Sequence, residues 1–188
     1  MARPLVGLIG RKQVGKDTVA ARLVERHGYV RYAFADNVRK VALAIDPLID
    51  IGFEYVPLSA VVEEDGWEMG KQLYPDVRQV LQRIGTEAIR EIDPYFWIRA
   101  VMDVVEADVR PVVITDVRFH NEAEAIRRAG GLLVRVIRPG GDTTDPHISE
   151  TELIDRATDY EIHNDAGLDY LTSQTDWMAG LINRRYGK

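Results

Sequence analysis

The sequence predicts an α/β fold in which a five-stranded parallel sheet carries helices on both faces, in three layers. Five short apolar segments bounded by Gly, Asp or Asn are expected to form the strands: 5–9, 30–34, 112–115, 132–137 and 160–163. The segments between them repeat apolar residues with the 3.6-residue period of a helix. Because strands and helices alternate along the chain, the strands should lie parallel and be covered by the helices.

Individual helices carry recognisable signals. A helix is expected over 77–88, and another from about residue 168 to the basic residues near the C-terminus. Asn121 with Glu124 has the spacing of a capping box, which predicts a helix start there. The apolar faces of the two helices are Val77, Val80, Leu81, Ile84 and Ala88 in the first, and Leu168, Leu171, Met178, Leu181 and Ile182 in the second.

Composition limits the classes of function. With 188 residues and 46% hydrophobic content, the chain should form a single domain over 1–188. Acidic residues outnumber basic ones, 30 to 24, which argues against a polymeric nucleic acid as partner. There is no cysteine and no apolar segment of membrane-spanning length, so we expect an intracellular protein of the cytoplasm with no membrane partner.

A glycine-bounded loop follows the first expected strand. Residues 10–18 read Gly-Arg-Lys-Gln-Val-Gly-Lys-Asp-Thr, which satisfies the G-x-x-x-x-G-K part of the Walker A pattern, the P-loop. Backbone N–H groups of such a loop, the start of the following helix and the Lys16 ammonium can together bind a triphosphate. The predicted ATP-binding residues are Gly10, Arg11, Lys12, Gln13, Val14, Gly15, Lys16, Asp17 and Thr18.

The residue after the loop lysine departs from the Walker A pattern. Ser or Thr at this position usually coordinates Mg²⁺, whereas this chain has Asp17 followed by Thr18. The expected strand 112–115 delivers Asp116 at its C-terminal edge, the Walker B position, where a carboxylate can orient water on Mg²⁺. Asp17, Thr18 and Asp116 are therefore the candidate metal ligands, although Asp116 could instead cap the next helix.

Arginines are the expected catalytic groups, because transfer to a phosphate acceptor needs positioning and charge neutralisation rather than a strong base. Arg118 could clamp a phosphate bidentately, or could be a surface residue. Arg138 begins a glycine-containing segment over 138–150. The candidate catalytic residues are Lys16, Asp116, Arg118 and Arg138. Further arginines considered for phosphate binding are Arg11, Arg39, Arg78, Arg83 and Arg90.

Several motifs together resemble the bacteriophage-type deoxynucleoside monophosphate kinases. They are G-x-x-x-x-G-K-D-T at 10–18, F-A-D at 34–36, L-Q-R-I-G-T-E at 81–87 with Arg90, T-D-V-R-F at 115–119 followed by Asn121 and Glu122, and H-I-S-E at 147–150. The resemblance extends from the first expected strand to the last helix. Asp17, anomalous for a Walker A motif, is the residue this family shows there.

The resemblance implies a nucleoside-monophosphate-kinase-like P-loop NTPase fold with a lid, ATP and Mg²⁺ as cosubstrate, and a deoxynucleoside monophosphate (dNMP) as acceptor. It implies a lid over 138–150 and an acceptor-side insertion over 52–77. If the chain is phage-encoded, its location is the host cytoplasm. The acceptor pocket candidates are Asp36, Arg39, Arg78, Gly85, Thr86, Glu87, Arg90 and Trp97.

Some alternatives stay open at this point. Trp97 could pack in the core instead of contacting a base, because it lies in a helical apolar stripe. The loop is also compatible with a phosphomevalonate-kinase-like enzyme, or with a non-catalytic ATP-binding regulatory module; the G-T-E segment favours a nucleotide acceptor. The sequence leaves open which bases are accepted and whether the chain is a monomer or a homodimer.

Overall fold

The computed structural model describes residues 3–140, 153 and 156–187, and the chain divides into two compact units. One unit comprises residues 1–33 and 101–188, and the other comprises residues 34–100. The predicted lid lies outside the described residues beyond Gly140. The single kinase domain over 1–188 and the acceptor-side role of 52–77 stay predictions.

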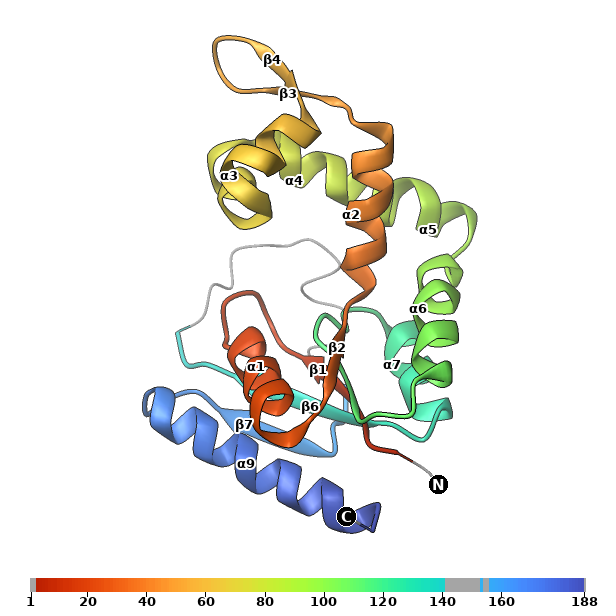
Figure 1. Ribbon diagram of the computed structural model, residues 1–188, viewed down its shortest axis with the longest axis vertical. Coiled ribbons are helices and arrows are strands. Elements are labelled where there is room, and N and C mark those ends of the chain that lie inside the picture. The colour runs from red at the N-terminus through yellow and green to blue at the C-terminus, as the bar shows by residue number, and fades with distance from the viewer. Residues whose placement is uncertain (1–2, 141–152, 154–155, 188) are drawn as a thin grey trace. The chain divides into compact units, whose positions relative to one another are not determined.

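The first unit is built on a five-stranded parallel sheet (Figure 1). Its strands are β1 (Leu5–Ile9), β2 (Val30–Tyr32), β5 (Val112–Ile114), β6 (Leu132–Ile137) and β7 (Tyr160–His163), in the order β2-β5-β1-β6-β7. Among the described residues, the helices of this unit are α1 (Lys16–His27), α7 (His120–Arg128), α9 (Leu168–Arg185) and the part of α6 (Phe96–Ala107) from Val101 onward. The five strands and their parallel arrangement confirm the predicted fold.

Side chains of β1 alternate between two cores, so the sheet is the middle of three layers. Val6 and Leu8 belong to the core that includes buried residues of α1 and α9. Gly7 faces the other way, where a Cβ would lie 2.7 Å from Ile126 of α7. Glycine at this position therefore allows α7 to pack closely on the sheet. Figure 1 shows α1 and α9 together on one face of the sheet.

The second unit is mainly helical. It contains α2 (Phe34–Ile45), α3 (Leu58–Leu73), α4 (Pro75–Gln82), the π-helix η1 (Arg83–Ala88), α5 (Ile89–Ile92) and the start of α6 (Phe96–Ala107). It also contains an antiparallel hairpin of β3 (Leu48–Asp50) and β4 (Tyr55–Pro57), which the sequence did not predict. Strands of three residues are too short to show the alternation by which a strand is recognised.

The helix predicted over 77–88 is present, but its geometry changes at Arg83. Val77 is fully buried, as predicted, whereas Ala88 is exposed. In the π-helix the backbone bonds run from i to i+5, so residues after the change no longer follow the α-helical face. The prediction that Ala88 lies on the apolar face was therefore wrong.

The last helix follows its predicted face in part. Leu171, Met178 and Ile182 of α9 are buried, but Leu168 is 64% exposed at the helix start. Thr175 takes a buried place on the same face, and its hydroxyl donates to the carbonyl of Leu171 at 2.8 Å. Among the described helices, none is long and apolar enough to cross a membrane.

Asp176 joins α9 to α1, the helix that begins at Lys16. Its carboxylate accepts hydrogen bonds from Arg22 Nε and from His27 Nε2, each at 2.8 Å. The hydrogen bond from Arg22, opposed by partial burial and supported by His27, lowers the pKa of Asp176 well below its usual range. The ionised carboxylate therefore stabilises the packing of the two helices.

Asp176→Asn is expected to lower the free energy of unfolding by about 1 kcal/mol at pH 7. Because the pKa of Asp176 is lower in the folded chain, its contribution is complete above the unfolded value of about 3.9 and is lost as the pH falls below it. Urea unfolding at pH 7 and pH 3 would measure this, with the exposed Asp103→Asn as control. If wild type and Asp176→Asn differed in free energy of unfolding as much at pH 3 as at pH 7, the charge-based explanation would be contradicted.

Candidate active site

The loop between β1 and α1 requires glycine at both ends. Gly10 has φ 150° and Gly15 has φ 107°, both in the region that favours glycine. A Cβ on Gly10 would lie 2.6 Å from the backbone oxygen of Val136, and one on Gly15 would lie 2.9 Å from Asn164 Nδ2. The two glycines thus let the loop turn tightly against the ends of the neighbouring strands, where parallel sheets bind ligands.

Lys16 is the first residue of α1, and its side chain folds back over the loop. The Lys16 ammonium donates hydrogen bonds to the carbonyl oxygens of Gly10 and Arg11, both at 2.6 Å. The first helical bond of α1 runs from Val19 N to Gly15 O at 3.0 Å, so the amides preceding Val19 in the first turn have no acceptor within the helix. A positive charge and a helix N-terminus therefore meet at this loop, which is the electrostatics of an anion site.

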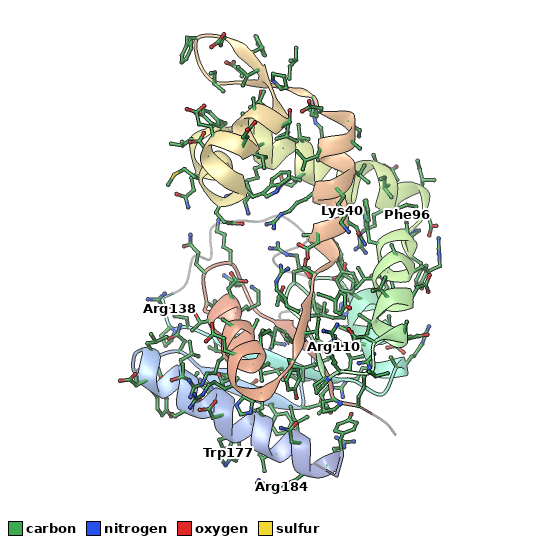
Figure 2. All side chains as sticks on the ribbon, in the orientation of Figure 1. Lys40, Phe96, Arg110, Arg138, Trp177 and Arg184 are labelled. Carbon is green, nitrogen blue, oxygen red and sulfur yellow. The ribbon has the colours of Figure 1, made fainter. Side chains whose placement is uncertain are left out.

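Two further side chains hold the loop from the ends of β6 and β7. Asn164 Nδ2 donates to the carbonyl of Val14 at 2.9 Å, and Arg138 Nη1 donates to the carbonyl of Gln13 at 3.5 Å. Figure 2 labels Arg138, which follows β6. Sequence reasoning found Arg138 but missed Asn164. The available signal was a polar side chain directly after a strand, at the sheet edge where ligands bind.

Asp116 lies at the same edge of the sheet, because β5 is the neighbour of β1. Gly7 is paired with Ile114, and extending this parallel register by two residues sets Asp116 beside Ile9, the residue before the loop. The amide of Val117 also donates to the carbonyl of Leu8 at 3.3 Å. The structure therefore brings the Walker B carboxylate and the P-loop to one edge.

The segment from Asp116 to Phe119 is held by a buried carboxylate. Glu122 is only 2% exposed, and its Oε2 accepts the amide N–H of Arg118 at 2.8 Å and that of Phe119 at 3.1 Å. Two backbone bonds to an acidic side chain fix the position from which the Arg118 side chain extends. From the sequence, Glu122 was predicted only as part of a motif, without this role.

The predicted cap of α7 was wrong in position. The helix begins at His120, so Asn121 lies inside its first turn and Glu122 is the residue that binds the amides before the helix. The pattern with Glu124 matched the spacing of a capping box, but only the acidic half of such a box is present, at Glu122, because the N-cap residue is Phe119. Because Glu122 binds the amides before the helix, the start of α7 is explained without Asp116 as its cap.

The residues proposed for Mg²⁺ suit a hard cation. Asp17 and Asp116 carry carboxylates and Thr18 a hydroxyl, and Mg²⁺ prefers oxygen ligands, commonly one or two carboxylates with substrate phosphates. Within the described ranges, no group of three or more His, Asp or Glu side chains could hold a metal alone. This donor set therefore fits a cation that binds together with a triphosphate, and the assignment of the three ligands stays a prediction.

The candidates for acceptor binding lie in the second unit. On α2, Arg39 lies 3.8 Å from Asp36 Oδ1, donates to Glu68 Oε1 at 3.1 Å and stacks over the Trp67 ring at 5.5 Å. Arg78 is exposed on α4, and Arg90 is partly buried on α5. The structure thus groups the predicted ATP and transfer residues in one unit and the predicted acceptor residues in the other.

The G-T-E segment lies in the π-helix. Trp97 of α6 is 2% exposed, and its indole Nε1 donates to the carbonyl of Gly85 at 2.9 Å. π-Turns are rare and often occur at functional sites. Trp97 therefore holds the backbone of this segment at Gly85. A contact between Trp97 itself and an acceptor stays a prediction.

Comparison with known proteins finds deoxynucleotide monophosphate kinases among the matches. Residues 59–175 match the family described as deoxynucleotide monophosphate kinase, a segment that does not include the loop at 10–18. A putative deoxynucleotide monophosphate kinase of Acanthamoeba polyphaga mimivirus is 33% identical over 164 residues, covering 79% of this chain and 81% of that protein.

The phage relatives are longer than the aligned region. The deoxynucleotide monophosphate kinase of Enterobacteria phage T4 is 30% identical over 116 residues, and that of Escherichia phage RB69 is 31% identical over 105 residues. These alignments cover 59% and 53% of this chain, but only 45% and 43% of the two phage proteins.

A solved structure supports the fold alone. The crystal structure of TT1252 from Thermus thermophilus has a TM-score of 0.52 and 17% sequence identity, and it covers 96% of this chain and 99% of that chain. The fold is that of a P-loop NTPase, with a parallel sheet enclosed by helices. By the extent of the family match and of the mimivirus alignment, this chain belongs to the deoxynucleotide monophosphate kinase family.

Proposed function

We propose that this chain transfers the γ-phosphoryl group of ATP to deoxynucleoside monophosphates, with Mg²⁺ as the companion of ATP. Membership in the family makes the chain a phosphotransferase that acts on dNMPs. The observation that carries the proposal is the Lys16 ammonium bound within a glycine-bounded loop at the start of α1. Beyond the family membership, we propose that ATP is the phosphoryl donor, that Mg²⁺ accompanies it, and that the residues named below bind them.

The chemistry requires charge neutralisation more than proton transfer. The acceptor is a phosphate oxygen that is already anionic, so no strong general base is needed. Lys16 binds the β- and γ-phosphates, while Arg118 and Arg138 balance the charge that develops on the transferred group. Asp17, Thr18 and Asp116 supply oxygen ligands for Mg²⁺, which when bound would neutralise part of the charge of the triphosphate.

Acceptor binding is assigned to the second unit. Arg39, Arg78 and Arg90 provide positive charge for the monophosphate, and Asp36 with the segment Gly85, Thr86 and Glu87 provides polar groups for the nucleoside. The family membership favours this nucleotide acceptor over the phosphorylated alcohol of a phosphomevalonate-kinase-like enzyme. The cytoplasmic location and the choice between monomer and homodimer stay predictions.

A coupled assay for ADP release tests the proposed activity. ATP should be incubated separately with dTMP, dGMP, dCMP, dAMP and dUMP, and the base specificity read from the rates. We expect ADP release only when a suitable dNMP is added. Release with ATP alone would indicate a hydrolase or a nucleotide-dependent switch, and absence of stimulation by all five dNMPs would contradict the kinase assignment.

Arg90→Ala is expected to raise the KM for the dNMP about tenfold or more while changing the KM for ATP little. A hydrogen bond from a guanidinium to a phosphate contributes about 1.5–3 kcal/mol, and losing it affects only the acceptor. Initial rates at varied dNMP and fixed ATP would measure the change. The exposed Arg99→Ala, on α6 of the same unit, is the control. An unchanged KM for the dNMP would remove Arg90 from the acceptor pocket.

A further inference from the structure

Asn164 stands at the end of β7 with its backbone held on both sides. Its amide N–H donates to the carbonyl of Ile137, the last residue of β6, at 2.7 Å. The preceding residue, His163, is held by Gln174 of α9, whose side chain accepts from His163 N at 3.1 Å and donates to His163 O at 2.6 Å. The bond to Ile137 therefore places Asn164 on the sheet, while α9 holds only the preceding residue, and neither contact involves the P-loop.

The side chain of Asn164 reaches the last turn of the loop. Its Nδ2 donates to the carbonyl of Val14 at 2.9 Å, and only the nitrogen end of the amide can make this bond to a carbonyl oxygen. A Cβ on Gly15 would lie 2.9 Å from the same Nδ2, so the missing side chain of Gly15 leaves room for the contact. The Val14 side chain is 4% exposed and is anchored in the core beneath the loop.

This contact fixes the orientation of one peptide plane. The described chain contains no cis peptide bond, so the C=O of Val14 and the N–H of Gly15 point in opposite directions. With the carbonyl bound to Asn164, the Gly15 N–H points away from Asn164. Glycine permits both orientations of the preceding peptide with little strain, so Gly15 alone does not choose between them. The bond from Asn164 supplies the preference.

We propose that Asn164 is a positioning residue for the phosphate-binding loop, which it holds with the Gly15 amide directed at the nucleotide phosphates. The proposal rests on the proposed binding of ATP at this loop. Asn164 itself does not touch ATP; it acts through the Val14–Gly15 peptide, immediately before the catalytic Lys16. Its loss should therefore weaken ATP binding without changing the acceptor side.

The test compares ATP binding and steady-state rates in the full chain. Titration calorimetry with Mg-ATP in the absence of acceptor should give a Kd for Asn164→Ala about five- to tenfold above that of the wild type, as expected for loss of one partly buried hydrogen bond. Asn164→Asp should weaken binding more, because a carboxylate cannot donate to Val14 O and would repel it. The KM for ATP should rise in parallel, and the KM for the dNMP should stay unchanged.

Gln174→Ala is the matched control, because Gln174 holds the same turn through His163 and has no hydrogen bond to the loop among the described contacts. It should lower the melting temperature but leave the Kd for Mg-ATP unchanged. An equal loss of ATP binding in Gln174→Ala, or a wild-type Kd in Asn164→Ala, would overturn the proposal. If Asn164→Asp does not fold, the Kd of Asn164→Ala for Mg-ATP alone tests the proposal.

The experiment separates this proposal from the proposed function. A wild-type protein that binds Mg-ATP but phosphorylates no dNMP would refute the kinase activity and leave the effect of Asn164 on binding to be read directly. A wild-type protein that binds no Mg-ATP would overturn both proposals.

Discussion

Lys16→Ala is expected to lower the kcat for dNMP phosphorylation by about 10²–10³-fold or more, as does the removal of other preorganised charge-stabilising groups. The Lys16 ammonium lies on the carbonyls of Gly10 and Arg11, where it can exchange these acceptors for the phosphates of ATP. Rates at saturating ATP and dNMP would measure the loss.

The fold should tolerate the same change. Lys16 is partly buried and contributes two hydrogen bonds to carbonyls that water can otherwise bind, so Lys16→Ala should shift the melting temperature little. Lys16→Arg keeps the charge but not the compact ammonium, and an intermediate rate is expected. The exposed Lys40→Ala, on α2, is the control. A wild-type rate in Lys16→Ala would mean that the loop does not take part in the transfer.

Arg118→Ala is expected to lower kcat by about 10²–10³-fold with a small change in the KM for ATP, because an arginine at a transferring phosphoryl group acts mainly in the transition state. The buried Glu122 carboxylate binds the amides of Arg118 and Phe119, so the backbone at Arg118 should keep its place in the variant. Single-turnover rates with bound ATP would isolate the transfer step.

Two controls define the interpretation of the Arg118 result. Arg118→Lys retains the charge without the planar fork and should recover only part of the activity. Arg128→Ala removes an exposed arginine of the neighbouring helix α7, where the guanidinium lies 3.4 Å from Glu124, and should leave the rate unchanged. If Arg118→Ala instead raised the KM for ATP and left kcat unchanged, Arg118 would contribute to the binding of ATP and not specifically to the transition state.

The sequence could predict the sheet because its strands are short, mostly apolar segments, of which β1, β5 and β6 are largely buried on both faces. Segments 5–9, 132–137 and 160–163 agree with β1, β6 and β7 to the residue. The P-loop was equally accessible, since its glycines and lysine lie within nine consecutive residues and act through local backbone geometry. Asp116 could be placed because it directly follows a predicted strand.

Other features depend on contacts between distant residues. Asn164 and Val14 are 150 positions apart in the chain, and no local pattern shows that a side chain after β7 will meet the loop after β1. The π-turn at Arg83–Ala88 is likewise supported by Trp97 from another helix. The true cap of α7 depended on a buried environment for Glu122, which sequence spacing alone does not reveal.

The sequence by itself thus determined the parallel sheet, the phosphate-binding loop with Asp17 after its lysine, and the motifs that place the chain in its family. These features follow from local composition, local spacing and glycine geometry. Only the tertiary structure decided which side chains support the loop and the Asp116–Phe119 segment, because it brings Asn164, Arg138 and Glu122 to backbone groups they bind. The P-loop could be recognised as a sequence motif, but the side chains that bind its Val14 and Gln13 carbonyls follow strands far along the chain.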